Sequence, residues 1–195
     1  MTSPRAPRRL AGLASLLGLL LVLPLAPARA ADTVVTVQDF SFTPASVRTG
    51  LGDTVTWVFL AMHTTTSNQR FWNSGARESG SYRVTFSDAG TFRYHCSMHP
   101  FMTGRVSVPV RAAGSATGGW RITWSVRTTT PANRRFDVRV KRVGASSWTS
   151  YRSATAKRSG SFDPARAGSY VVEARTRNVG VGASGWSPAL TVAVS

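Results

Sequence analysis

One short stretch of the chain gathers residues that can bind a metal. The segment "YHCSMHPFMTG", residues 94–104, holds the only cysteine of the 195 residues and two of the three histidines. Cys96, His99 and Met102 follow one another at intervals of three residues. A thiolate, an imidazole and a thioether are all metal ligands. The spacing therefore predicts that this stretch is a ligand loop.

The residues before the loop predict the strand that positions it. In "TFRYHC", residues 91–96, the period of two places Tyr94 and Cys96 on one face, and Arg93 and His95 on the other. We therefore expect Cys96 at the inner end of a strand. His95 points away from it and is interpreted as a solvated strand residue.

A fourth donor must come from elsewhere in the chain. His63, at the end of "TVTWVFLAMH", is the histidine that remains. A thiolate, two imidazoles and a weak thioether are the donor set of a mononuclear blue-copper site, in which the thioether tunes the potential. We therefore expect His63, Cys96, His99 and Met102 to bind one copper ion. Zinc would use the same donors, but its lower affinity favours copper.

Each of these residues, taken singly, also has a structural explanation. A lone cysteine is usually a small buried hydrophobe, His63 fits a loop and Met102 fits a core. Met98 offers a competing thioether, but it lies between Cys96 and His99, where the geometry for coordination is poor. The combination and its spacing favour the metal site.

The histidine count argues against an enzyme. A trinuclear copper oxidase centre needs many more histidines than the three in this chain, and a binuclear centre needs a second cysteine. Copper nitrite reductases place a histidine before the cysteine, as His95 is here, but they need further histidines from a second domain. Residues 112–195 contain none. No histidine is left over for a hydrolytic triad.

The first half of the chain resembles a known family. "FSFTPASVRTGLGDTVTWVF" (40–59), "TVTWVFLAMH" (54–63) and "GTFRYHCSMHPFMTGRVSV" (90–108) are similar to cupredoxins, with the Cys-x2-His-x2-Met loop of amicyanin- and pseudoazurin-like bacterial members. The resemblance covers residues 31–110. It implies a Greek-key β-sandwich with a type 1 copper that cycles between Cu(I) and Cu(II).

The resemblance also implies how electrons leave the site. They would pass through the exposed edge of His99, and Pro100 and Phe101 would form an apolar docking patch around it. The family usually has an asparagine after the first histidine, which ties the two ligand loops together. Here that residue is Thr64, so the hydrogen bonds around the ligands are left open.

The rest of the chain predicts a second all-β domain. "RAAGSATGG", residues 111–119, is a small-residue linker. Residues 120–195 resemble a fibronectin type III domain, a smaller immunoglobulin-like β-sandwich, with Trp124 as the core tryptophan and Tyr170 as the corner tyrosine that bonds back to the backbone. In "FDVRVKR" (136–142), apolar and charged residues alternate, which is typical of a half-buried strand.

The net charge of the two halves of the chain differs, and this difference indicates what each half could bind. Residues 31–111 carry seven basic and five acidic residues, whereas residues 112–195 carry thirteen and three. A basic second half predicts either a solvated face or contact with anionic cell-wall polymers, lipid head groups or an acidic redox partner. Nucleic acid is not expected outside the cytoplasm.

The first thirty residues predict export. Arg5, Arg8 and Arg9 precede the apolar run 10–23, and "APARA" ends at Ala30, the pattern of a signal peptide. That run is too short to span a bilayer. We therefore expect an extracytoplasmic protein, secreted or periplasmic, that does not span a membrane and cannot form an internal disulfide.

These observations favour a carrier of single electrons between redox partners. The first alternative is copper binding and delivery, although a delivery site is often methionine-rich and the chain has four methionines. The second is an adhesive two-module protein in which copper is incidental.

Overall fold

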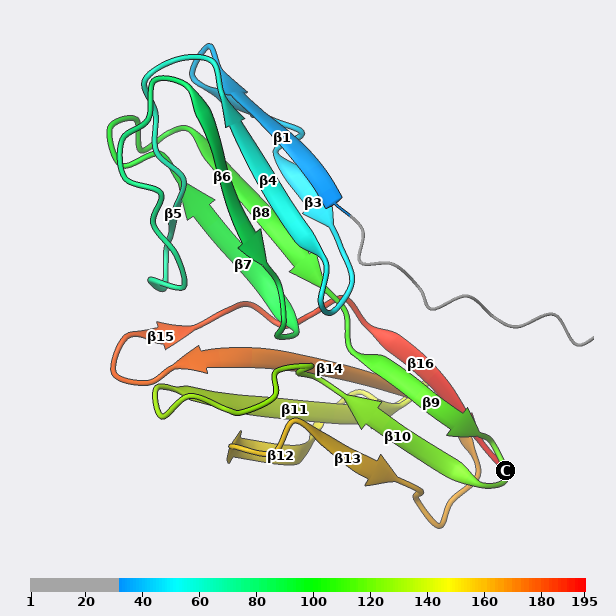
Figure 1. Cartoon of the computed structure of the whole chain (residues 1–195). Coiled ribbons are helices and arrows are strands. Elements are labelled where there is room, and N and C mark those ends of the chain that lie inside the picture. Colours follow the sequence, from blue (N-terminus) through cyan, green and yellow to red (C-terminus); the bar gives the residue numbers. More distant parts are fainter. Residues whose placement is uncertain (1–31) are drawn as a thin grey trace, which may run out of the picture.

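The computed structural model describes residues 32–195, which form two β-sandwich modules (Figure 1). Within these residues there is no helix, so the all-β prediction is confirmed. No helix long and apolar enough to cross a membrane occurs in the described part of the chain. The expected signal peptide, residues 1–30, lies outside it.

Two four-stranded sheets make up the first module. One has the order β2-β1-β4-β6 and the other β3-β8-β7-β5, and each contains one parallel pair, β1 with β4 and β3 with β8. The strands are β1 Asp32–Gln38, β2 Ser41–Thr43, β3 Ser46–Arg48, β4 Thr54–Phe59, β5 Thr66–Ser67, β6 Gly80–Thr85, β7 Gly90–His95 and β8 Thr103–Val108.

Aromatic residues fill the space between these sheets. Trp57 of β4 is completely buried, and its ring meets that of Tyr94 of β7 edge-on at 5.4 Å. Phe42 and Trp72 pack against the Tyr94 ring from two further directions. Because alternate side chains of a strand face the same side, burying Tyr94 also turns Cys96 inward, as predicted.

The second module is also built from two sheets. The smaller has the order β13-β10-β9, and the larger the order β12-β11-β14-β15 with β16 also on β14; every pair is antiparallel. The strands are β9 Arg111–Ser115, β10 Gly119–Thr123, β11 Arg134–Arg142, β12 Thr149–Thr155, β13 Ser159–Phe162, β14 Gly168–Asn178, β15 Gly182–Ala183 and β16 Leu190–Val194.

One expectation for this region is wrong. Residues 111–119 are not a free linker, because 111–115 form strand β9, which pairs with β10 from Arg111↔Thr123 to Ser115↔Gly119. Small side chains hide an edge strand from pattern analysis, since pairing uses only the backbone. The expected core tryptophan is confirmed, with Trp124 fully buried. The Tyr170 hydroxyl donates to the carbonyl of Arg166 at 2.6 Å, as predicted for a corner tyrosine.

The two modules are joined by specific contacts at one end of the first. Asp88 is buried and accepts hydrogen bonds from Arg127 at 2.8 Å and from the Ser125 hydroxyl at 2.8 Å. Thr91 and Gly185 exchange two backbone hydrogen bonds of 2.9 Å. Thr91 lies at the start of β7, and the cysteine loop follows its end, so the second module lies at the opposite end from the ligand loops (Figure 1).

Candidate metal centre

Three side chains converge where β4 and β7 end. His63 follows β4, whereas Cys96 and His99 follow β7, and their ligand atoms all lie within 4.8 Å of one another. The Cys96 Sγ lies 3.7 Å from the Nδ1 atoms of both His63 and His99. Those two nitrogens are 3.2 Å apart. The structure therefore brings together the cysteine and the two histidines that the sequence singled out.

These distances fit one metal ion between the three atoms. For nitrogens at about 2.0 Å and a sulfur at about 2.3 Å in a trigonal plane, the N–S separations come to about 3.7 Å and the N–N separation to about 3.5 Å. A trigonal His2Cys arrangement is typical of blue-copper sites. Cys96 is fully buried and His63 is 3% exposed, so water has little access to these donors.

Burial also prepares His63 to bind a metal. Burial, and to a lesser extent the neighbouring His99, lower the pKa of His63, although Asp39 opposes this effect. A lowered pKa keeps the imidazole neutral, which is the form that donates a lone pair to a metal.

Backbone hydrogen bonds fix the loop that follows β7. The amide of His99 donates to the carbonyl of Cys96 at 3.2 Å, and the amide of Met102 donates to the carbonyl of His99 at 2.9 Å. The amide of Cys96 in turn donates to the carbonyl of Met102 at 3.0 Å. Two successive tight turns are thus closed by backbone hydrogen bonds, which hold the loop in one conformation.

Thr64 links the two ligand loops. Its backbone amide donates to the Cys96 Sγ at 3.3 Å, and its side-chain oxygen accepts a hydrogen bond from the Ser97 amide at 2.7 Å. The hydroxyls of Thr66 and Ser97 meet at 2.9 Å and add a second contact. The threonine that replaces the family's asparagine therefore still ties the loops together. The sequence marked this position as a departure but did not show that a hydroxyl performs the same task.

The other residues that the sequence analysis singled out differ in burial. Met102 is buried at 2%, whereas Met98 is 42% exposed, which agrees with the preference for Met102. His95 is half-buried, points away from the cluster, and its Nδ1 lies 2.8 Å from the Asn68 Oδ1. Phe101 is 73% exposed.

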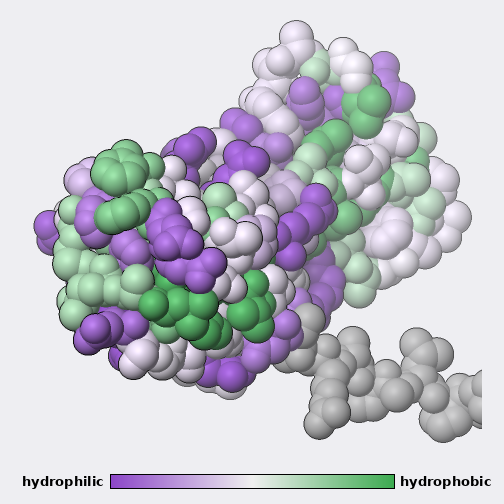
Figure 2. Space-filling model, turned by 90° about the horizontal axis from the view of Figure 1, so that it is seen from above, coloured by the Kyte–Doolittle hydropathy of each residue, from purple (hydrophilic) through white to green (hydrophobic). Residues whose placement is uncertain are grey.

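Several large apolar side chains are exposed on the segments around the ligand loops. Figure 2 looks down on the molecule from the end that carries the ligand loops, and apolar residues appear there among polar ones. The exposed side chains are Phe40 in the turn between β1 and β2, Leu60 and Met62 before His63, and Met98 and Phe101 after Cys96. Of these five, only Phe101 was assigned to an apolar patch from the sequence, and Met98 was considered only as a competing thioether.

A β-sandwich that gathers two imidazoles and a thiolate at one end defines a copper-binding protein. No protein-family model matches the chain. Amicyanin from Paracoccus denitrificans is 33% identical over 97 residues, which cover 44% of this chain and 72% of that protein. The chain therefore belongs to the amicyanin-like cupredoxins, and its cofactor is a single copper ion.

Solved amicyanin structures give similar matches. An oxidised amicyanin variant is 28% identical, with a TM-score of 0.36, and the match covers 39% of this chain and 80% of the variant. A reduced Cu(I) form of another variant is 29% identical, with a TM-score of 0.37, and the match covers 42% of this chain and 86% of that variant.

Proposed function

We propose that this protein carries single electrons between redox partners, with His63, Cys96, His99 and Met102 as the copper ligands. The observation that carries the proposal is the convergence of the Cys96 Sγ and two histidine Nδ1 atoms within 3.7 Å of one another. A bound copper ion supplies a one-electron couple between Cu(II) and Cu(I).

The protein's part is to hold the donors still. The closed turns of residues 96–102 and the Thr64 bonds keep the imidazoles and the sulfur in one arrangement. Donors that do not move between oxidation states leave little to reorganise when an electron is exchanged. The amide of Thr64 also donates a hydrogen bond to the sulfur at 3.3 Å, which helps to fix the position of this donor.

Burial supports electron carriage over copper delivery. A delivery site must release its ion readily, but Cys96 is fully buried and His63 nearly so. His99 is half-buried and lies beside Phe101, with their ring centroids 6.0 Å apart. We therefore assign the exposed edge of His99 as the electron path, with Pro100 and Phe101 as the patch that docks an unidentified redox partner.

The second module is proposed to be a fibronectin type III-like domain that spaces or stabilises the first. Its sheet order, the buried Trp124 and the Tyr170 bond to Arg166 support this assignment. We propose a boundary after residue 110, with strand β9 belonging to the second module. The apolar run and "APARA" before the described residues support an extracytoplasmic location, secreted or periplasmic.

A copper titration followed by optical spectroscopy tests the proposal. The purified protein should take up one copper per chain and show an intense band near the red end of the visible spectrum. Cys96→Ser should abolish the band, because the colour arises from the copper–thiolate bond. His95→Gln is the matched control, a histidine beside the cysteine but outside the cluster, and should keep the band. Full copper loading without colour would end the proposal.

A further inference from the structure

The turn between β1 and β2 holds a residue in a conformation that does not suit it. Gln38 and Ser41 are paired, so Asp39 and Phe40 form a two-residue hairpin turn. Their φ angles are 47° and 57°. Such a turn prefers Asn or Asp followed by Gly, and a phenylalanine in the left-handed region is strained. Phe40 is also 57% exposed, so core burial does not offset that strain.

The Phe40 ring lies on the two histidines of the metal centre. It meets the His99 ring edge-on, with centroids 4.8 Å apart and planes at 88°. It meets the His63 ring at 5.8 Å and 82°. Phe101 lies beside both Phe40 and His99, with its ring centroid 6.3 Å from the first and 6.0 Å from the second. A single side chain from a separate hairpin thus contacts both imidazoles, which themselves come from different loops.

We propose that Phe40 is a positioning residue of the metal centre. Its ring packs against His63 and His99 from outside and limits the access of water to the metal centre. Backbone strain at an exposed residue is a sign of function when the surrounding structure does not need it. Here the strained residue places its ring against both histidines. This inference rests on the proposed copper site.

The variant Phe40→Gly distinguishes the effect of the residue on the stability of the turn from its effect on the metal centre. Glycine adopts a positive φ without cost, so the copper-free variant should unfold at the same or a higher temperature than the copper-free wild type. The copper-loaded variant should release copper to a chelator about tenfold faster, as when a residue that supports a ligand is lost. Its visible band and reduction potential should also shift. Phe40→Tyr should restore all three properties.

Leu60→Ala is the matched control for loss of exposed apolar surface in the first module, since Leu60 is 60% exposed, about as much as Phe40. It should leave the band and the release rate unchanged. Wild-type band, potential and release rate in Phe40→Gly would overturn the inference, as would a lower unfolding temperature of its copper-free form. A wild type that gives no coloured copper form would instead refute the proposed function.

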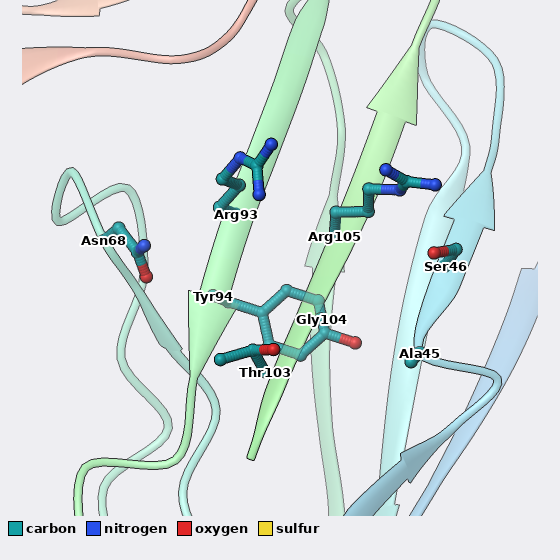
Figure 3. A pocket seen from close by; sticks show the side chains of 8 residues that line it. All are labelled: Ala45, Ser46, Asn68, Arg93, Tyr94, Thr103, Gly104 and Arg105. Carbon is teal, nitrogen blue, oxygen red and sulfur yellow. The ribbon is translucent and has the colours of Figure 1, made fainter. Parts of the chain in front are cut away.

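A second feature lies on the outer face of the β3-β8-β7-β5 sheet. There a hollow of about 380 Å³ is lined by several side chains that can donate hydrogen bonds and by no carboxylate (Figure 3). Its lining residues are Ala45, Ser46, Asn68, Arg93, Tyr94, Thr103, Gly104 and Arg105. Arg93 and Arg105 are direct partners across β7 and β8, and both are exposed. Like charges placed opposite each other on a sheet destabilise it.

These two arginines differ from the ion-paired arginines on the large sheet of the second module. On β11 and β14, Arg139 pairs with Glu173, and Arg175 and Arg177 pair with Asp137. Among the described ion pairs, neither Arg93 nor Arg105 has a carboxylate partner. Several arginines of the second module, among them Arg121, Arg135 and Arg152, also lack an ion pair among those described. Arg93 and Arg105 carry the inference because they lie directly opposite each other and line one hollow.

We infer that this hollow binds a carboxylate cluster of an acidic redox partner. Guanidinium forks match carboxylates in geometry and charge. Arg93 lies on β7, three residues before Cys96, so a partner bound here lies beside the strand that leads to the metal ligand. The inference rests on the proposed function for the identity of the partner, but the anion site itself does not need copper.

The paramagnetic trianion hexacyanochromate(III) can map the site by NMR on the copper-free protein. Amide signals of Arg93, Thr103 and Arg105 should broaden selectively, and an oligoglutamate peptide should reverse the effect. The double variant Arg93→Glu and Arg105→Glu should lose it, whereas Arg48→Glu, an exposed arginine outside the hollow, should keep it. Broadening concentrated on the second module, or retained in the double variant, would overturn the inference. Selective broadening without electron exchange between the copper form and ferricyanide would instead refute only the proposed function.

Discussion

The side-chain oxygen of Thr64 lies 2.7 Å from the backbone nitrogen of Ser97, and this hydrogen bond joins the residue after one ligand to the residue after another. Both residues also touch Thr66, whose hydroxyl lies 3.2 Å from that of Thr64 and 2.9 Å from that of Ser97. The three hydroxyl groups form a small polar clasp beside the buried sulfur of Cys96.

Thr64→Val should loosen this clasp without changing the shape of the side chain. The Ser97 amide then loses its acceptor, which should lower the free energy of unfolding by about 1 kcal/mol. Faster release of copper should accompany the loss, because the two ligand loops are no longer tied. Chemical denaturation and transfer of copper to a chelator measure the two effects. Thr64→Ser keeps the hydroxyl and should behave as wild type; equal behaviour of the Val variant would contradict the role.

Gly104→Ala should disturb the core beneath the arginine hollow. A Cβ at this position would lie 2.5 Å from the Tyr94 hydroxyl oxygen, and the buried Tyr94 ring has little room to move. We expect a loss of about 1–3 kcal/mol in the free energy of unfolding, as for overpacked cores. Gly118→Ala is the control, because its new Cβ would meet only the flexible Ser115 hydroxyl. Equal stability of the two variants, measured by denaturation, would refute the packing argument.

Asp88→Asn should weaken the contact between the modules. The Asp88 side chain is 5% exposed, and the Arg127 side chain that it binds is 33% exposed. Breaking a partly buried ion pair of this kind should cost about 2 kcal/mol, after allowance for screening at the exposed arginine. Unfolding followed by tryptophan fluorescence measures the cost. Asp32→Asn breaks an exposed pair with Arg83 and should cost less than about 1 kcal/mol; a cost for Asp88→Asn no larger than this would count against the interface.

Asp137 should make the second module sensitive to acid. Burial alone would raise its pKa, but hydrogen bonds from Arg177, the Ala154 amide and Arg175 outweigh burial, so the pKa lies below its ordinary value. A depressed carboxyl pKa adds stability above the unfolded pKa of about 3.9, and this stability is lost as the pH falls through the folded pKa.

We therefore expect the unfolding temperature to fall as the pH drops below about 4, and to fall less steeply in Asp137→Asn. Thermal unfolding at a series of pH values provides the measurement. Asp163→Asn, which changes an exposed carboxyl, should keep the wild-type slope. An unchanged slope in Asp137→Asn would show that the ion pairs with Arg175 and Arg177 add nothing.

Strands with several alternating residues could be predicted from the sequence. "TVTWVF" coincides with β4, Thr54–Phe59, and "FDVRVKR" lies within β11, Arg134–Arg142. The short strands β2, β3, β5 and β15 have two or three residues each, too few for a period to show. They are strands because a neighbouring backbone pairs with them, which is a property of the folded chain.

Alternation also predicts the side on which a residue lies but not what covers it. Asp137 was expected on the charged outer face of its strand together with Arg139 and Lys141. It is on that face, yet it is only 5% exposed, because Arg175 and Arg177 of β14 reach across it. The identity of the neighbouring strand decides this burial, and local sequence does not carry that information.

The residues of the metal centre also differ in how far the sequence predicts them. Cys96 and His99 could be grouped by their spacing, and His63 by elimination, because few residues of these types exist in the chain. Thr64 and Phe40 could not be given their roles in this way. One acts through a hydroxyl and the other through a strained turn, and both depend on tertiary placement.

The isolation of the sulfur of Cys96 has one more consequence. It is the single thiol of the chain and has no exposed surface. An alkylating reagent can therefore reach it only when the loop between β7 and β8 opens or the domain unfolds. In the copper-free protein the rate of alkylation therefore measures how often this loop opens. The signal comes from one site and one product, because the chain has no other cysteine.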